Sequence, residues 1–170
     1  MDLKSVIRSI PDFPRKGIIF RDITTVLNDS AAFRFAVDAM TEKLEGVEFD
    51  AIVAPESRGF IFGAALAYNM GKAFVPARKP GKLPYNTIRQ DYALEYGEDA
   101  VEIHSDAVSR GRRAVIVDDL LATGGTCSAI ADLLNGAGCK TAAAVFLIEL
   151  AALGGRHRLD GLDVRSVVVY

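Results

Sequence analysis

Two adjacent acids followed by a turn of small residues are the part of this chain with the clearest chemical potential. Residues 115–117 are the β-branched run Val-Ile-Val, and Asp118 and Asp119 come directly after it. Such a run is typical of a parallel strand that is buried on both faces. Because open α/β sheets bind ligands beyond the carboxyl ends of their strands, we expect both carboxylates to face a site. There they can accept hydrogen bonds from vicinal hydroxyl groups.

The turn after the acids has the composition of a phosphate-binding loop. Residues 123–126 are Thr-Gly-Gly-Thr. They offer glycines that can approach a ligand closely, two hydroxyl donors and the free amides of a helix that begins there. The carboxylates could bind two hydroxyl groups, and the nearby amides could bind one phosphate. Together these groups match the outline of a ribose 5-phosphate.

Each half of this segment also occurs in proteins with different sites. Paired acids after a strand serve as magnesium ligands of the Walker-B type, and Gly-Gly turns are common in ordinary loops. However, neither G-x-x-x-x-G-K-[ST] nor G-x-G-x-x-G occurs in the chain. A P-loop would therefore lack its phosphate-binding half.

A second turn of the same kind is expected at residues 55–59, between a strand at 51–54 and a helix at 60–70. Its Ser57 hydroxyl, its Arg58 guanidinium and the amides that open the helix suit another phosphate group.

A basic segment follows the strand expected at 73–77. Arg78, Lys79, Lys82 and Arg89 precede the next acid, Asp91. A solvated basic loop is the usual meaning of such a run. Its place after the carboxyl end of a strand instead favours a lid that folds over an anionic ligand, and Pro80, Gly81 and Pro84 favour a loop over a helix.

The elements that must position these residues alternate between strands and helices. We expect helices at 2–10, 30–44, 60–70 and 127–136, strands at 51–54, 73–77, 113–117, 141–148 and 164–169, and a possible hairpin around 92–96. Right-handed crossovers between them predict an α/β fold with a mainly parallel twisted sheet flanked by helices. The 170 residues fit a single domain.

Bulk composition excludes several classes of protein. A net charge of -2 and a pI near 5.7 argue against a nucleic-acid partner. No apolar run is long enough for a membrane, and the first residues lack a signal-peptide core. Cys127 and Cys139 have no metal or redox spacing. We therefore expect a cytoplasmic protein with reduced thiols.

The segment from Val115 to Thr126 resembles the phosphoribosyl pyrophosphate (PRPP) motif of type I phosphoribosyltransferases, and its Leu-Leu-Ala at 120–122 is similar to the adenine-specific members. The resemblance implies the type I phosphoribosyltransferase fold in one domain, 1–170, with a small N-terminal hood (about 1–30) and a mobile lid loop (about 78–98). It also implies adenine and PRPP as substrates, AMP and pyrophosphate as products, and a homodimer. Mg²⁺ would be the cofactor, held mainly by PRPP and not by metal ligands of the protein.

The same resemblance implies roles for individual residues. Catalysis would rest on Glu95, Arg58, Asp118 and Asp119. Adenine would be bound by Ile19, Phe20, Arg21 and Leu121. Without the resemblance, Phe20 would ordinarily be explained as a core residue and Glu95 as a surface residue. PRPP would be bound by Ser57, Arg58, Arg78, Lys79, Lys82, Asp118, Asp119, Ala122, Thr123, Gly124, Gly125 and Thr126.

Two alternatives stay open. A related enzyme would use xanthine, hypoxanthine or guanine as the base. A non-catalytic PRPP-binding regulator of the same fold would need an added effector surface, for which 170 residues leave little room.

Overall fold

The computed structural model describes residues 1–93 and 98–170. By the contacts within it, the chain divides into two compact units, Met1–Ala39 and Met40–Tyr170. Each unit is described by itself. No helix among the described residues is long and apolar enough to cross a membrane.

The first unit is built around a small antiparallel hairpin. In chain order it contains α1 (Leu3–Val6), β1 (Arg8–Pro11), β2 (Ile19–Asp22), α2 (Thr24–Leu27) and most of α3 (Ser30–Glu42). Asp29 caps α3, because its Oδ1 accepts from the amides of Ala31 at 2.9 Å and Ala32 at 3.0 Å.

The predicted helix at 2–10 is wrong beyond Val6. Residues 8–11 instead pair with β2, so that Arg8 lies opposite Asp22 and Ile10 lies opposite Phe20. The helical spacing of apolar residues at the N-terminus misled the prediction, because the pairing partner lies further along the chain and local spacing does not record it.

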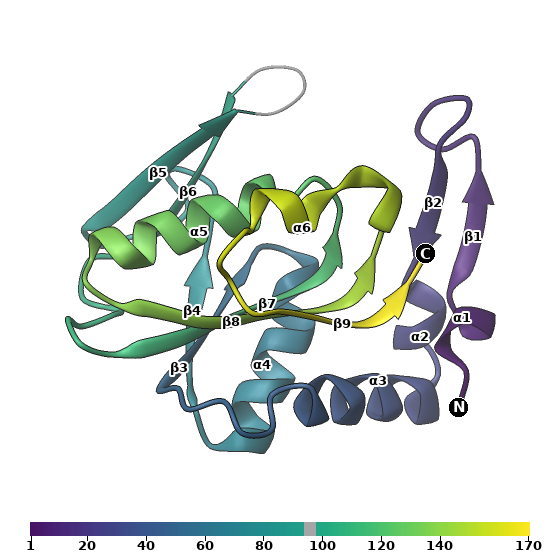
Figure 1. Ribbon diagram of the computed structural model, residues 1–170, viewed down its shortest axis with the longest axis horizontal. Helices are drawn as coiled ribbons and strands as arrows, with labels where there is room; N and C mark the ends of the chain where they lie inside the picture. Colours follow the sequence, from purple (N-terminus) through teal and green to yellow (C-terminus); the bar gives the residue numbers. More distant parts are fainter. Residues whose placement is uncertain (94–97) are drawn as a thin grey trace. The chain divides into compact units, whose positions relative to one another are not determined.

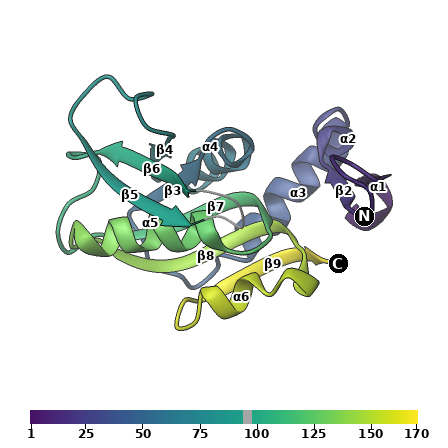
Figure 2. The same cartoon turned by 90° about the horizontal axis from the view of Figure 1, so that it is seen from above.

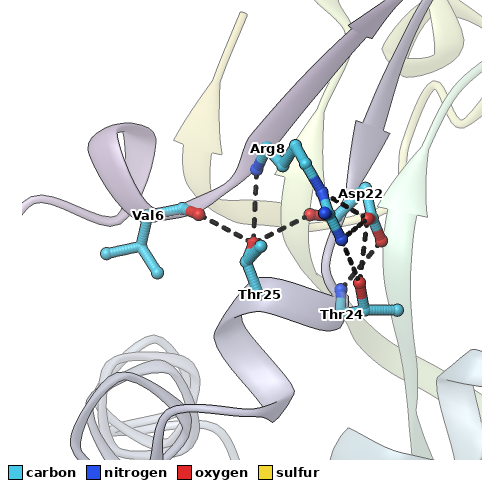
Figure 3. Close-up of polar contacts among 5 residues, drawn as sticks. All are labelled: Val6, Arg8, Asp22, Thr24 and Thr25. Carbon is cyan, nitrogen blue, oxygen red and sulfur yellow. Dashed lines mark hydrogen bonds and ion pairs between the residues drawn. The ribbon is translucent and has the colours of Figure 1, made fainter.

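Asp22 organises the end of this hairpin (Figure 3). Its carboxylate accepts from Arg8 Nη2 at 2.7 Å and from the amide and hydroxyl of Thr24 at 2.9 and 2.8 Å. Thr25 completes the cluster by donating its hydroxyl to the carbonyl of Val6 at 2.7 Å. These hydrogen bonds, first those from Thr24, hold the pKa of Asp22 below its ordinary value.

The second unit contains a five-stranded sheet in the order β4-β3-β7-β8-β9, and every neighbouring pair in it is parallel. The strands are β3 (Ala51–Pro55), β4 (Ala73–Ala77), β7 (Arg113–Leu121), β8 (Lys140–Glu149) and β9 (Val164–Val169). The predicted parallel sheet flanked by helices is therefore confirmed. Residues 115–117 and 143–148 have at most 1 % of their surface exposed, which explains their uninterrupted apolar sequence.

Two long helices cover opposite faces of this sheet (Figure 1). α4 (Arg58–Met70) connects β3 to β4, and α5 (Gly125–Gly136) connects β7 to β8. The two crossovers leave the adjacent central strands β3 and β7 in opposite directions, so right-handed connections must place their helices on opposite faces. The carboxyl ends of β3 and β7 thus form the topological switch point, where α/β sheets bind ligands.

The second unit also contains a hairpin and two short helical segments. The expected hairpin consists of β5 (Thr87–Ala93) and β6 (Glu98–His104), which pair antiparallel, and Figure 2 shows it beside α5. After β8 come the short 3-10 helix η1 (Ala151–Leu153) and the four-residue helix α6 (Gly155–Arg158).

Candidate active site

The paired acids lie where β7 runs past its neighbour β3. The ladder between these strands ends at Val53 and Ile116, whereas the ladder with β8 continues to Leu121. Asp118 and Asp119 therefore belong to the strand itself and not to the loop behind it. On the β3 side they border a cavity of about 490 Å³, lined by Pro55, Glu56, Ser57, Arg58, Lys79, Asp118, Asp119, Leu120 and Thr126.

The two acids occupy different electrostatic environments. Asp119 is 5 % exposed, and its Oδ2 accepts from Arg58 Nε at 2.5 Å. Asp118 Oδ1 accepts from the amide of Asp119 at 2.8 Å. Burial, followed by repulsion from the Asp119 carboxylate, raises the pKa of Asp118 well above its ordinary value. Hydroxyl donors or a bound cation in the cavity would make the charged form of Asp118 more favourable.

The turn that joins β7 to α5 borders a second cavity, of about 90 Å³. Gly124 has a φ of 80°, a left-handed conformation that favours glycine, and α5 begins at the next residue. Both cavities are bordered by Asp118, Leu120 and Thr126, so the two cavities are adjacent. The smaller cavity is further lined by Leu121, Ala122, Thr123, Gly124, Gly125, Cys127 and Phe146.

The turn from β3 to α4 packs directly on the first acid. A Cβ atom on Gly59 would lie 2.9 Å from Asp118 Oδ1 and 3.2 Å from the carbonyl oxygen of Val117, so only glycine fits there without a shift. The Glu56–Ser57 peptide bond in this turn is cis. Ser57 and Arg58 reach the larger cavity from the start of α4, as their position after a strand predicts.

Acidic partners balance much of the charge on the basic segment. Arg78 Nη2 donates to Glu56 Oε2 at 3.1 Å, and the amide of Lys79 donates to Glu56 Oε1 at 2.6 Å. Burial raises the pKa of Glu56, but these bonds outweigh it and the net shift is downward. Lys79 Nζ contacts Asp99 Oδ2 at 2.9 Å. Lys82 is exposed.

Glu56 and Asp99 are polar residues of this site that the sequence did not identify. Glu56 lies inside the Pro55–Gly59 turn, but no sequence pattern assigned it a role. Asp99 lies about ten residues after the basic segment and belongs to no motif. Tyr92 was expected only as part of a hairpin. Its hydroxyl lies 3.3 Å from Thr126 Oγ1 and 3.4 Å from Asp99 Oδ2, so it connects the hairpin to the phosphate turn.

The residues predicted to bind adenine lie in both units. On β2 of the first unit, Ile19 is 51 % exposed, and Phe20 is half-buried with its ring edge-on to Phe13 at 5.3 Å. Arg21 Nη1 donates to Ser9 Oγ at 2.5 Å. Leu121 belongs to β7 of the second unit and is 2 % exposed. Glu95 lies outside the described residues.

Comparisons with known proteins agree with this architecture. Residues 24–168 match the family model of the phosphoribosyl transferase domain. An adenine phosphoribosyltransferase of Thermotoga neapolitana is 56 % identical over 170 residues, which is all of both chains.

Two solved structures extend the likeness to three dimensions. The adenine phosphoribosyltransferase of Thermoanaerobacter pseudethanolicus superposes with a TM-score of 0.96 at 55 % identity, covering 98 % of this chain and 97 % of that one. The Saccharomyces cerevisiae enzyme, solved with adenine and an imino-altritol bisphosphate, gives 0.89 at 38 % identity over 95 % and 94 % of the two chains. This chain thus belongs to the phosphoribosyl transferase family, among its adenine phosphoribosyltransferases.

Proposed function

We propose that this protein transfers the phosphoribosyl group of PRPP to adenine and releases AMP and pyrophosphate. The observation that carries the proposal is the pair of adjoining cavities at the switch point of the sheet. One is bordered by two acids and an arginine, the other by a Thr-Gly-Gly-Thr turn, and Asp118 and Thr126 border both. Its full-length relatives bear the name of this activity.

PRPP would lie along these cavities from one phosphate to the other. The amides and hydroxyls of residues 122–126 would hold the 5-phosphate at the start of α5. Asp118 and Asp119 would accept from the two ribose hydroxyls. Ser57 and Arg58, with Arg78, Lys79 and Lys82 from the lid loop, would hold the pyrophosphate.

The reaction needs no covalent nucleophile. Departure of pyrophosphate leaves a ribose with oxocarbenium character, so the protein must align the two reactants and stabilise separating charges. The two carboxylates would lie on the side of the developing cation, and the basic groups on the side of the leaving anion. Glu95 would accept the imidazole proton that adenine loses as the new bond forms.

Mg²⁺ would arrive bound to PRPP. No group of three or more His, Cys, Asp and Glu among residues 1–93 and 98–170 is arranged to hold a metal ion. Mg²⁺ in phosphate-binding sites generally keeps several waters and binds through one or two carboxylates together with substrate phosphates. When bound, it would neutralise charge growing on the pyrophosphate. The Asp118 and Asp119 carboxylates supply hard oxygen atoms beside the ribose position.

Adenine recognition would fall to β2 and to Leu121. Phe20 would stack on the purine, and main-chain groups near Ile19 and Arg21 would bind its edge. The exposed apolar surface at Phe13, 50 %, and Ile19, 51 %, supports a ligand-binding role for this hairpin. Leu121 would contact the base from the border of the smaller cavity.

We infer one functional domain over residues 1–170, with a hood at about 1–30 and a lid at about 78–98. Ile61 and Tyr68 lie seven residues apart on α4 with 37 % and 88 % exposure, which supports a homodimer contact on that helix. Both cysteines are free and buried, as suits the reducing cytoplasm.

Incubation with Mg²⁺, PRPP and one labelled base at a time tests the activity. We expect nucleotide from adenine and at least about 100-fold less from hypoxanthine, guanine or xanthine, because a site that binds the edge of one base leaves its polar groups unpaired with another. A preference for an oxopurine would favour the related enzyme. PRPP binding without any nucleotide would favour the regulator.

A further inference from the structure

The phosphate turn rests on a short backbone segment that follows β8. Gly155 is buried, and a Cβ atom placed on it would collide with the carbonyl oxygen of Ala122 and lie 2.9 Å from Leu121 Cδ1. From the other side, a Cβ atom on Gly124 would lie 2.7 Å from the carbonyl oxygen of Gly155. The backbone at 155 therefore lies directly against the backbone at 122–124, with no room for a side chain between them.

Little regular structure holds Gly155 in place. It opens α6, a helix of only four residues, and the left-handed Gly154 precedes it. Such a short helix is marginal without tertiary support. The position of Gly155 must therefore depend on contacts made by its neighbours.

The next residue, Arg156, supplies such contacts. Its Nε donates to Glu149 Oε1 at 2.6 Å and its Nη2 to Glu149 Oε2 at 2.7 Å, a bidentate ion pair. Its Nη1 donates to the carbonyl oxygen of Val164 at 2.7 Å. One guanidinium thus connects the segment to the end of β8 and the start of β9.

Glu149 is built to receive this arginine. It is 5 % exposed, and its Oε2 also accepts from Ser166 Oγ at 2.6 Å. The hydrogen bonds from Arg156, which outweigh burial, hold the pKa of Glu149 below its ordinary value. Glu149 also lies opposite Leu121 in the β7–β8 ladder, one residue before the phosphate turn begins.

We propose that Arg156 is a positioning residue for the 5-phosphate site, an inference that rests on the function proposed above. Its pair with Glu149 fixes the backbone of Gly155, and Gly155 fixes the turn at 122–124. The amides of that turn then keep the spacing that a phosphate requires before any ligand arrives. The arginine acts through the backbone and does not touch the substrate.

The proposal predicts which kinetic constant changes. Contacts to the 5-phosphate are the same before and during bond breaking, so loosening its site should weaken PRPP binding more than it slows saturated turnover. We expect Arg156→Met to raise the KM for PRPP about tenfold, in line with the cost of misplacing a binding group by a fraction of an ångström. The KM for adenine should change less than about twofold.

Arg165 provides a matched control on the neighbouring strand. Its Nε and Nη2 both pair with one carboxylate, at 3.0 and 2.7 Å from Asp163 Oδ2. Its Nη1 donates to the carbonyl oxygen of Lys43, which is not part of the segment that contacts the phosphate turn. Arg165→Met therefore removes a comparable ion pair without loosening Gly155. It should leave both KM values unchanged.

The experiment compares wild type, Arg156→Met and Arg165→Met in steady-state kinetics and in calorimetric binding of ribose 5-phosphate. A tenfold weaker binding of ribose 5-phosphate in Arg156→Met alone supports the proposal. Unchanged binding in folded Arg156→Met, or an equal loss in Arg165→Met, overturns it. If Arg156→Met does not fold, Ser166→Ala and Arg156→Lys replace it. Weaker binding of ribose 5-phosphate in these variants, by a smaller factor than tenfold, supports the proposal, and unchanged binding overturns it. An inactive wild type would instead overturn the proposed function.

Discussion

The Nε atom of Arg58 lies 2.5 Å from Oδ2 of Asp119, although the two residues are 61 positions apart in the chain. The arginine proposed to hold the leaving group is thus paired with an acid proposed to hold the ribose. The Asp119 side chain is 7 % exposed and the Arg58 side chain 50 % exposed, so Arg58 is the partner with room to move. Binding of PRPP would exchange this internal pair for contacts to the ligand.

Replacing Asp119 by Asn tests the acid's part in that exchange. The substitution keeps the size of the side chain but removes the charge that attracts Arg58 and the developing ribose cation. We expect kcat/KM for PRPP to fall by at least about 100-fold. Circular dichroism and urea unfolding should show an intact fold.

Asp163→Asn is the control for this variant. Asp163, the residue before β9, is a carboxylate with a half-exposed side chain that also pairs with an arginine, at 2.7 Å from Arg165 Nη2. Near-normal activity of Asp119→Asn, or an equal loss in Asp163→Asn, would contradict the role assigned to Asp119.

Asp118→Asn should separate activity from stability. Burial raises the pKa of Asp118 above its ordinary value of 3.8, so above that pH the folded protein binds a proton more tightly than the unfolded chain. The contribution of Asp118 to the free energy of unfolding therefore falls as pH rises from the unfolded pKa through the folded one. Asn carries no such charge, so relative to wild type the variant should gain stability as the pH rises through this window while losing activity.

Urea unfolding of both proteins at several pH values measures this difference. A variant that loses stability relative to wild type as the pH rises would show that the Asp118 charge is favourable in the folded state.

Gly59→Ala should damage the site through a single methyl group. The new Cβ would lie 2.9 Å from Asp118 Oδ1 and 3.0 Å from Pro55 Cδ, so the acid or the α4 terminus must shift. We expect kcat/KM to fall about tenfold or more. Steady-state kinetics with PRPP as the varied substrate measure the change.

Gly136→Ala is the matched glycine control. Gly136 ends α5, and a Cβ there would meet nothing within 4 Å. This variant should keep its kinetics and gain up to about 1 kcal/mol in the free energy of unfolding. Equal kinetic losses in the two variants would remove the steric explanation for Gly59.

Glu95→Gln tests the proposed proton acceptor. An amide cannot take the imidazole proton, so kcat should fall by about 100-fold or more while the KM for PRPP changes little. Asp91→Asn replaces an exposed acid on β5 that pairs with Arg89, and it should leave kcat near wild type. An unchanged kcat in Glu95→Gln would exclude Glu95 from the mechanism.

The sequence by itself determined the features that depend on local pattern. A β-branched run predicted the buried strand β7, and alternating strands and helices predicted the parallel sheet. The order of the phosphate-loop, Arg58 and basic motifs indicated the family. These features can be predicted from the sequence because strand burial and turn conformation depend on neighbouring residues.

Tertiary structure decided everything that depends on distant pairing. The N-terminal residues 8–11 join β2 although their spacing is helical, because a strand partner overrides a weak local preference. Glu56 and Asp99 meet the basic segment from other strands and turns, and Arg156 reaches Glu149 through the packing of α6 near the sheet edge. Such ion pairs depend on strand order and register, which no local run of residues records.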